Sequence, residues 1–143
     1  MTYVAAPFFN NEEIENLNRL QEFLLREFPD TDFFFPREHK IPDGDFMSNQ
    51  EWASKVYEID VEALKESDCV IALYDGHYSD TGAAWEIGYA CALNKPITLL
   101  IVNCDKDQSI MPINCANFVF DFEEFINPNG MYISDPLTKI NQK

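Results

Sequence analysis

The fold is decided by residues 69–102, which read CVIALYDGHYSDTGAAWEIGYACALNKPITLLIV. Residues 69–74 are continuously apolar, which is typical of a central strand buried on both faces of a parallel sheet. Residues 81–94 have the composition of a helix, and residues 96–102 read as a second apolar strand. A strand, a helix and a strand in this order predict one right-handed crossover unit.

The same alternation continues towards both ends of the chain. We expect strands at residues 3–6, 33–35 and 117–120, and helices at residues 11–28 and 50–67. Asn10 or Asn11 can cap the helix at residues 11–28. The order predicts an α/β, doubly wound (flavodoxin-like) fold, with a five-stranded parallel sheet and helices on both faces. We expect one domain, residues 1–126, and a C-terminal tail, residues 127–143, that packs on a neighbouring subunit.

Composition narrows the class of partner. The 143 residues suit a single domain, and 46% hydrophobic residues suffice for a core. Ten Lys and Arg against 25 Asp and Glu give a net charge of −15, which repels nucleic acids and anionic membranes. No apolar run reaches membrane length and no secretion signal is evident, so we expect a cytoplasmic protein without nucleic-acid or membrane partners.

Missing motifs narrow the chemistry further. The glycines form no phosphate-binding loop, the two histidines have no metal or triad spacing, and the four cysteines have no zinc spacing. We therefore expect no cofactor and no metal.

Two carboxylates occupy apolar surroundings. Asp60 falls within the apolar half of its helix, where it either hydrogen-bonds a buried group or performs a function. Glu86 is the one carboxylate of residues 81–94, a helix so apolar that we expect it to be buried. Gly88 costs that helix about 1 kcal/mol relative to Ala, which suggests that space is needed there. For Glu86 the functional interpretation is favoured over a capping or pairing role.

Further candidates surround the carboxyl ends of the expected strands, where ligands bind in such sheets. Tyr3 lies on the first strand, close enough in the expected order to reach Glu86. Phe8 and Phe9 follow that strand and could sandwich a planar ring, or simply pack in the core. Asp80 either caps the following helix or holds a sugar hydroxyl. Two carboxylates at a sugar's anomeric centre are standard for double displacement. The residues alone indicate a small-molecule α/β enzyme that uses carboxylates.

Several segments, in this order and spacing, resemble the nucleoside 2-deoxyribosyltransferase family over roughly residues 2 to 126. They are residues 3–9 (YVAAPFF), Asp60, residues 80–90 (DTGAAWEIGYA) and residues 112–114 (PIN). The resemblance implies that Glu86 is the nucleophile, that Tyr3 orients it and that Asp60 protonates the departing base. By the same resemblance, Asp80 binds deoxyribose, Asn114 contacts a neighbouring subunit's sugar, and Lys40 stands where relatives offer a Gln to the base.

The implied activity is base exchange between 2′-deoxyribonucleosides and free purine or pyrimidine bases, as in nucleotide salvage, with net retention through a deoxyribosyl-Glu86 ester. A homo-oligomer, a dimer or a hexamer, would complete the sites across its interface. One alternative is an N-glycoside hydrolase of nucleosides or deoxynucleoside 5′-monophosphates on the same fold. Another is a non-catalytic nucleoside-binding module, which gives no reason for Glu86 and Asp60 to share apolar surroundings.

Overall fold

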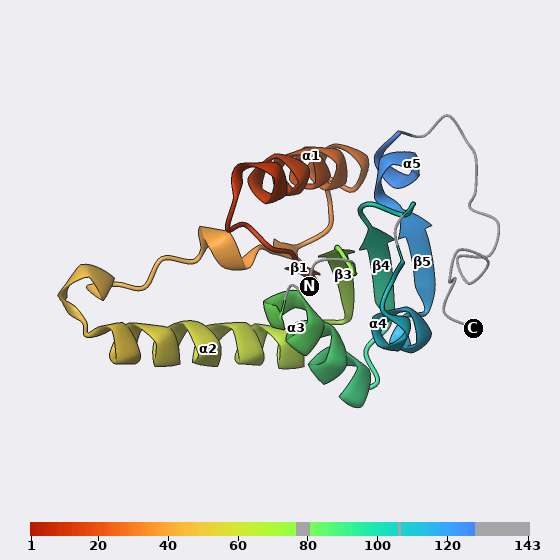
Figure 1. Ribbon diagram of the computed structural model, residues 1–143. Coiled ribbons are helices and arrows are strands. Elements are labelled where there is room, and N and C mark those ends of the chain that lie inside the picture. Colours follow the sequence, from red (N-terminus) through yellow and green to blue (C-terminus); the bar gives the residue numbers. More distant parts are fainter. Residues whose placement is uncertain (77–80, 106, 128–143) are drawn as a thin grey trace.

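The computed structural model describes residues 1–76, 81–105 and 107–127. Five parallel strands form one sheet in the order β2-β1-β3-β4-β5 (Figure 1). The strands are β1 (Thr2–Ala5), β2 (Phe33–Phe34), β3 (Cys69–Tyr74), β4 (Ile97–Ile101) and β5 (Phe118–Asp121). This arrangement confirms the predicted flavodoxin-like fold, with the apolar β3 at the centre of the sheet.

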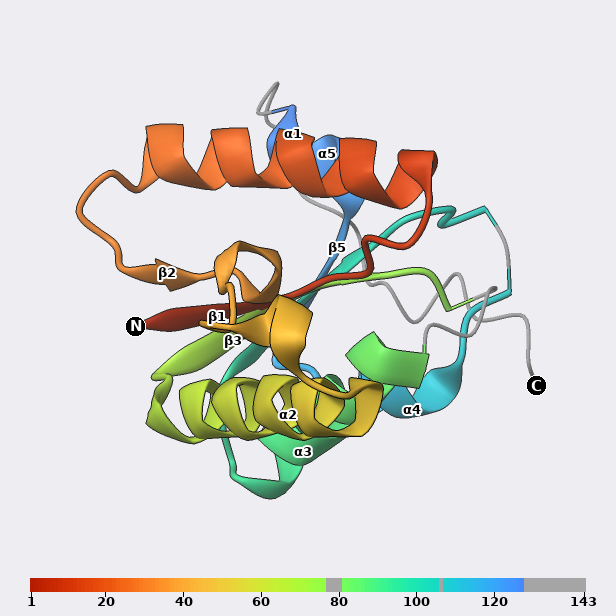
Figure 2. The same ribbon diagram turned by 90° about the vertical axis from the view of Figure 1, so that its left-hand side faces the viewer.

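Helices cover both faces of the sheet. Figure 1 shows α1 (Asn11–Glu27) and α5 (Phe122–Ile126) on one face, and α2 (Asn49–Glu66), α3 (Thr81–Ala92) and α4 (Ile110–Cys115) on the other. Two short 3-10 helices, η1 (Pro36–Glu38) and η2 (Gly44–Phe46), connect β2 to α2. In Figure 2, the strands run between α1 above and the α2 and α3 pair below, with their carboxyl ends towards the start of α1.

The two long helices begin where the sequence supplies caps. The side chain of Asn10 accepts a hydrogen bond from the backbone N–H of Glu13, whose carboxylate accepts the N–H of Asn10 in return. Ser48 and Glu51 form the same reciprocal pair at the start of α2. Each pair satisfies backbone donors that the first helical turn leaves open.

Strand alternation divides the core between the two faces. Tyr3 and Ala5 of β1 belong to the apolar cluster that contains α3, whereas Val4 belongs to the cluster that contains Leu20 of α1. Because successive side chains of a strand point to opposite faces, this register aims Tyr3 at α3. The carboxyl ends of β1 and β3 meet at the same edge, since Ala5 pairs with Ala72.

One expectation about α3 is wrong for the single chain. The helix buries Ala83, Ile87 and Ala90 against the sheet, but Trp85 remains 45% exposed. A side chain built at Gly88 would meet nothing within 4 Å, so the glycine opens outwards rather than against a close neighbour within the chain. Helix α3 packs by one side only, and its apolar composition continues around the outer side.

Helix α4 was not predicted from the sequence, because its six residues include Pro112 and are too few to show a period. Within the described residues, no helix has both the length and the apolarity needed to span a membrane.

Candidate active site

A tyrosine and a glutamate form the centre of the site. Tyr3 is completely buried on β1, and its hydroxyl donates a hydrogen bond to Oε1 of Glu86 over 2.7 Å. Glu86 is half-buried on α3, one turn after the helix begins. Strand alternation and the β-α-β crossover bring the two side chains together across 83 residues of sequence. The bond holds the Glu86 carboxylate in one orientation.

Electrostatics keep the Tyr3 hydroxyl a donor. Burial is the main cause that raises the pKa of Tyr3, and the negative charge of Glu86, the hydrogen bond to it and the negative charge of Asp60 raise it further. The phenol therefore stays protonated throughout the physiological range. Asp60 of α2 is thus near enough to Tyr3 for its charge to act on the phenol.

Asp60 has the environment of a proton donor. The side chain is half-buried on α2, and burial raises the pKa of its carboxyl above the ordinary range, while a positive charge on His39 acts in the opposite direction. A carboxylic acid with a raised pKa keeps its proton to a higher pH and can give it to a leaving group.

Aromatic rings flank the pair on the β2 side. The ring of Phe34 stacks on Tyr3, with centroids 5.3 Å apart and planes within 15°. The imidazole of His39, which follows η1, also stacks on Phe34, with centroids 4.0 Å apart and planes within 11°. The ring of Phe34 thus stacks with both the buried phenol that contacts Glu86 and the exposed imidazole of His39.

The two phenylalanines after β1 are available at the surface. Phe8 is 38% exposed and Phe9 is 81% exposed, and their rings stack at 5.5 Å and 12°. Neither ring belongs to the buried core, so these residues do not simply pack in the core. The two rings instead form a flat apolar surface that a ligand can reach. Such a surface can contact a planar base.

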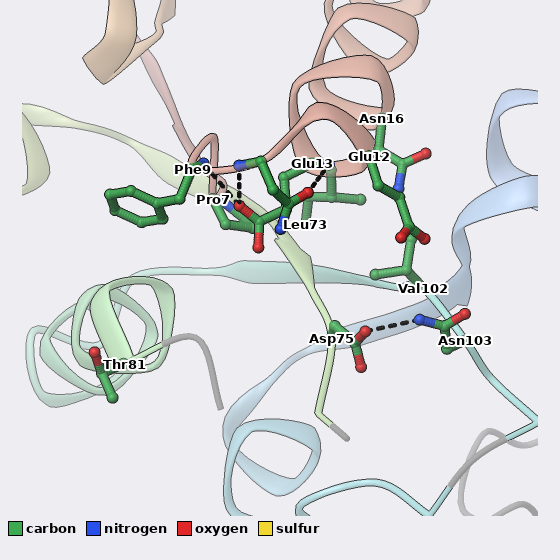
Figure 3. Close-up of a pocket in the computed structure, with 11 residues that line it drawn as sticks. Pro7, Phe9, Glu12, Glu13, Asn16, Leu73, Asp75, Thr81, Val102 and Asn103 are labelled. Carbon is green, nitrogen blue, oxygen red and sulfur yellow. Dashed lines mark hydrogen bonds between the residues drawn. The ribbon is translucent and has the colours of Figure 1, made fainter. Parts of the chain in front are cut away.

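A cavity of about 440 Å³ opens at the carboxyl ends of β1, β3 and β4, beside the first turn of α1 (Figure 3). Its polar lining combines carboxylates and amides: Asn10, Glu12, Glu13, Asn16, Asp75 and Asn103. In Figure 3, Asp75 accepts a hydrogen bond from the Asn103 amide over 2.7 Å, and Thr81 of α3 lies across from α1. Carboxylates and amides bind hydroxyl groups, and the carboxylates repel a phosphate.

Tyr3, Glu86 and Asp60 are not among the residues that line this cavity. They lie on the α2 and α3 face of the sheet, whereas the cavity adjoins α1. Thr81, the first residue of α3, lines the cavity, so one helix contributes to both places. The catalytic candidates and the cavity are therefore neighbouring parts of one sheet edge.

The structure shows no contact of Asn114 or Lys40 with the Tyr3–Glu86 pair within the described residues. Asn114 is exposed on α4 and donates its amide to the Ile110 carbonyl over 2.8 Å. Lys40 is exposed in the loop after η1. Asp80 lies outside the described residues, as does the C-terminal tail beyond residue 127. Residues 1–76, 81–105 and 107–127 contain no group of three or more His, Cys, Asp or Glu side chains that could hold a metal.

Sequence reasoning missed two features of this edge. His39 lacked any recognisable spacing, and its stacking on Phe34 depends on the conformation of a loop. The Asp75–Asn103 pair joins the ends of β3 and β4. The sheet order could have indicated that pair, because the carboxyl ends of adjacent parallel strands meet.

Known proteins resemble this chain in sequence and in fold. Residues 2–137 match the sequence profile of a family described as nucleoside 2-deoxyribosyltransferase. A nucleoside deoxyribosyltransferase of Limosilactobacillus fermentum is 33% identical over 120 residues, which cover 78% of this chain and 70% of that protein. The solved 2-deoxyribosyltransferase of Bacillus psychrosaccharolyticus superposes with a TM-score of 0.74 at 30% identity, covering 97% of this chain and 95% of that one.

A second solved structure shares the fold only. The CMP N-glycosidase of Clostridium botulinum superposes with a TM-score of 0.56 at 21% identity, over 88% of this chain and 95% of that one.

Proposed function

This chain belongs to the nucleoside 2-deoxyribosyltransferase family, and on that premise we propose that it exchanges the base of 2′-deoxyribonucleosides with retention of configuration. The observation that carries the proposal is the hydrogen bond between Tyr3 and Glu86, and Asp60 lies near enough to Tyr3 for its charge to act on the phenol. A double displacement requires an oriented carboxylate as the nucleophile and a second carboxyl group that can donate a proton, and a raised pKa favours the second role.

In the first step an oxygen of Glu86 attacks the anomeric carbon of the deoxyriboside. The bond between that carbon and the base nitrogen breaks, the bonding electrons leave with the base, and the Asp60 carboxyl protonates it. The product is a deoxyribosyl ester of Glu86. The Tyr3 hydroxyl keeps the carboxylate oriented towards the sugar, which reduces the entropic cost of reaching the transition state.

In the second step a nitrogen of another base attacks the same carbon from the face that the first base left. The ester bond breaks, Glu86 recovers its charge, and Asp60 accepts the proton that the incoming base gives up. Two inversions give net retention. The missing 2′-hydroxyl suits this chemistry, because an oxocarbenium-like transition state is then easier to form.

The surroundings support a nucleoside rather than a nucleotide as substrate. Glu12, Glu13 and Asp75 line the neighbouring cavity, where their negative charges would repel a 5′-phosphate. Phe8 and Phe9 offer the base a flat apolar surface. In this proposal Asp80 holds the deoxyribose and Lys40 approaches the base.

We propose further that the enzyme is a homo-oligomer, a dimer or a hexamer, in which Asn114 completes the site of a neighbouring subunit. The exposed aromatic rings of α2 and α3 support association, because Trp52, Tyr57 and Trp85 are 49%, 57% and 45% exposed. Rings of this size are costly to leave in water and are enriched in protein interfaces.

An N-glycoside hydrolase is the second candidate, favoured by the shared fold of the CMP N-glycosidase. It uses the same first step, after which water rather than a base attacks the ester. Exclusion of water from the ester decides between the two outcomes.

The test is incubation of the purified protein with thymidine and adenine, with chromatography of 2′-deoxyadenosine, thymine and free deoxyribose. Glu86→Ala is the inactive variant, and Glu58→Ala removes an exposed carboxylate of α2 as the matched control. We expect 2′-deoxyadenosine from the wild type and the control, and none from Glu86→Ala.

Thymine and deoxyribose without 2′-deoxyadenosine would identify a hydrolase. If thymidine is inert, deoxyinosine replaces it as donor, because a purine-specific transferase cannot use thymidine. Binding of both nucleosides without turnover of either would identify a non-catalytic module.

A further inference from the structure

Among the described residues, two asparagines have a left-handed backbone. Asn94 and Asn103 both have a φ of 55°, a region that strains asparagine less than most L residues and glycine not at all. Asn94 lies just after α3, the ordinary place for such a residue, and its backbone N–H donates to the Cys91 carbonyl over 3.0 Å. Asn103 lies after β4 instead, and its side-chain amide donates to Oδ2 of Asp75 over 2.7 Å. Glycine would satisfy the backbone at both positions, so the amide is what distinguishes Asn103.

A buried glutamine holds the backbone on both sides of this pair. Gln108 is 3% exposed, and its amide nitrogen donates to the Asn103 carbonyl over 3.0 Å. Its amide oxygen accepts the backbone N–H of Gly76, the residue after Asp75, over 3.2 Å. A Cβ at Gly76 would lie 2.6 Å from that oxygen, so the glycine leaves room for the Gln108 amide. These hydrogen bonds join the ends of β3 and β4 and hold Asn103 beside Asp75.

The Asp75–Asn103 pair lies on the wall of the cavity, towards which a sugar at Glu86 can extend. In Figure 3 both residues line the cavity across from the first turn of α1. Thr81, the first residue of α3, lines it as well. From Thr81 to Glu86 the helix rises by about 7.5 Å, and helical side chains lean towards the N-terminus, which brings the Glu86 carboxylate closer to the cavity. A deoxyribose with its anomeric carbon at Glu86 can therefore extend its other end towards Asp75.

We propose that Asp75 is a specificity-determining residue that accepts a hydrogen bond from the 5′-hydroxyl of the deoxyribose, and that Asn103 is the residue that positions it. The inference rests on the proposed function, which puts the anomeric carbon at Glu86. The 5′-hydroxyl is the sugar hydroxyl farthest from that carbon, so it reaches furthest into the cavity. A carboxylate offers about four acceptor sites, so Asp75 can bind a hydroxyl while it accepts the Asn103 amide. The same negative charge repels a 5′-phosphate.

The test of Asp75 removes the hydroxyl and the carboxylate separately. Thymidine and 5′-deoxythymidine differ only in the 5′-hydroxyl, and each serves as donor, with adenine as acceptor, for the wild type and Asp75→Ala. We expect Asp75→Ala to lower kcat/KM for thymidine by about 10- to 150-fold, as the loss of a hydrogen bond to a charged group implies. For 5′-deoxythymidine the change should be less than about twofold, because that donor has no hydroxyl to lose a partner. If thymidine is inert, 2′-deoxyinosine and its 5′-deoxy analogue replace the two donors.

The test of Asn103 removes the amide and keeps the backbone. Asn103→Gly fits the left-handed conformation without strain, and Asn94→Gly makes the same change at the end of α3 as the matched control. We expect Asn103→Gly to lower kcat/KM for thymidine by about 3- to 10-fold, the effect of one ordinary hydrogen bond, and to leave 5′-deoxythymidine unchanged. Asn94→Gly should change neither. In urea denaturation both variants should have the midpoint of the wild type or a higher one.

The outcomes separate a binding role from a structural one. Equal losses for the two donors in Asp75→Ala, or no loss with thymidine, would overturn the role of Asp75. An unchanged kcat/KM for thymidine in Asn103→Gly would overturn the positioning role.

A binding measurement distinguishes this inference from the proposed function. Titration calorimetry with both nucleosides uses Glu86→Ala, which cannot form the ester, with and without the additional Asp75→Ala substitution. We expect the second substitution to weaken binding of thymidine and not of 5′-deoxythymidine. The same result in a protein whose wild type has no exchange activity would support the role of Asp75 and refute the proposed function.

Discussion

Removal of the Tyr3 hydroxyl tests how much the orientation of Glu86 contributes to the reaction. Tyr3→Phe keeps the ring, its burial and its stacking on Phe34, and deletes one hydrogen bond of 2.7 Å to Glu86. A hydrogen bond to a charged group is worth about 1.5–3 kcal/mol. If the bond acts fully in the transition state, its loss lowers kcat by roughly 10- to 150-fold.

The fold should survive this substitution. Phe occupies the same buried space as Tyr3 and leaves no polar atom unpaired on β1, while the half-buried Glu86 can be solvated. We expect the free energy of unfolding to change by about 1 kcal/mol or less. Urea denaturation of both proteins measures this directly.

The assay is base exchange between thymidine and adenine, with kcat and KM determined separately. Tyr89→Phe is the matched control, because that tyrosine also lies near Glu86 in sequence but stacks on Trp85 at 5.1 Å. We expect kcat to fall in Tyr3→Phe and to stay unchanged in Tyr89→Phe. A folded Tyr3→Phe enzyme with kcat within about twofold of the wild type, far less than the loss of a charged hydrogen bond implies, would refute the orienting role.

Three further predictions concern stability. Burial raises the pKa of Asp60, so the folded state binds that proton more tightly than the unfolded chain does, and stability is lost as the pH rises through the folded pKa. Asp60→Asn should therefore raise Tm more at about pH 7 than at about pH 4. Calorimetry that shows no such difference would contradict this prediction. Arg19 binds Glu123 through two hydrogen bonds of 2.7 and 2.6 Å and lowers the pKa of Glu123, so the stabilisation is present above the unfolded pKa and lost as the pH falls through the folded pKa. Glu123→Gln should therefore cost at most about 1 kcal/mol at neutral pH and nothing in acid, as measured by urea denaturation. Gly88→Ala should stabilise the subunit by about 0.5–1 kcal/mol, because nothing lies within 4 Å of the added methyl group; a loss of subunit stability, or a changed oligomer in gel filtration, would show that a neighbouring copy occupies this space.

The sheet could be predicted because its central strands are continuous apolar runs in the sequence. Residues 69–74 and most of residues 96–102 became β3 and β4, and Asn10, one of the two predicted caps, begins α1. The sheet order follows from right-handed crossovers. Helix α4 lacks both length and periodicity, so no sequence pattern could indicate it.

The exposure of α3 could not be predicted from its composition. An apolar helix looks the same in sequence whether the sheet alone covers it or a second molecule covers its other side. In the single chain the outer side carries Trp85 and Gly88, both exposed. The prediction of a fully buried α3 is therefore wrong for the single chain, because the outer side of the helix is exposed to solvent.

The contact between Tyr3 and Glu86 could be anticipated, because the period of two in β1 and the position of α3 direct both side chains to one face. The conformation of a loop follows no comparable periodicity, so contacts made by loop residues could not be predicted. The approach of His39 to Phe34 depends on the backbone after η1. Asn103, which contacts Asp75, has a left-handed backbone with φ of 55°, a conformation that the sequence pattern alone does not reveal.

The most direct test of the account is to look for the covalent intermediate on Glu86. The protein is mixed with a 2′-deoxyribonucleoside in the absence of an acceptor base, quenched rapidly in acid and digested for peptide mass spectrometry. We predict a single deoxyribosyl group on the peptide that contains Glu86, which disappears when adenine is added before the quench. Base exchange that proceeds without any adduct, or an adduct on another residue, would contradict the assignment of Glu86 as the nucleophile.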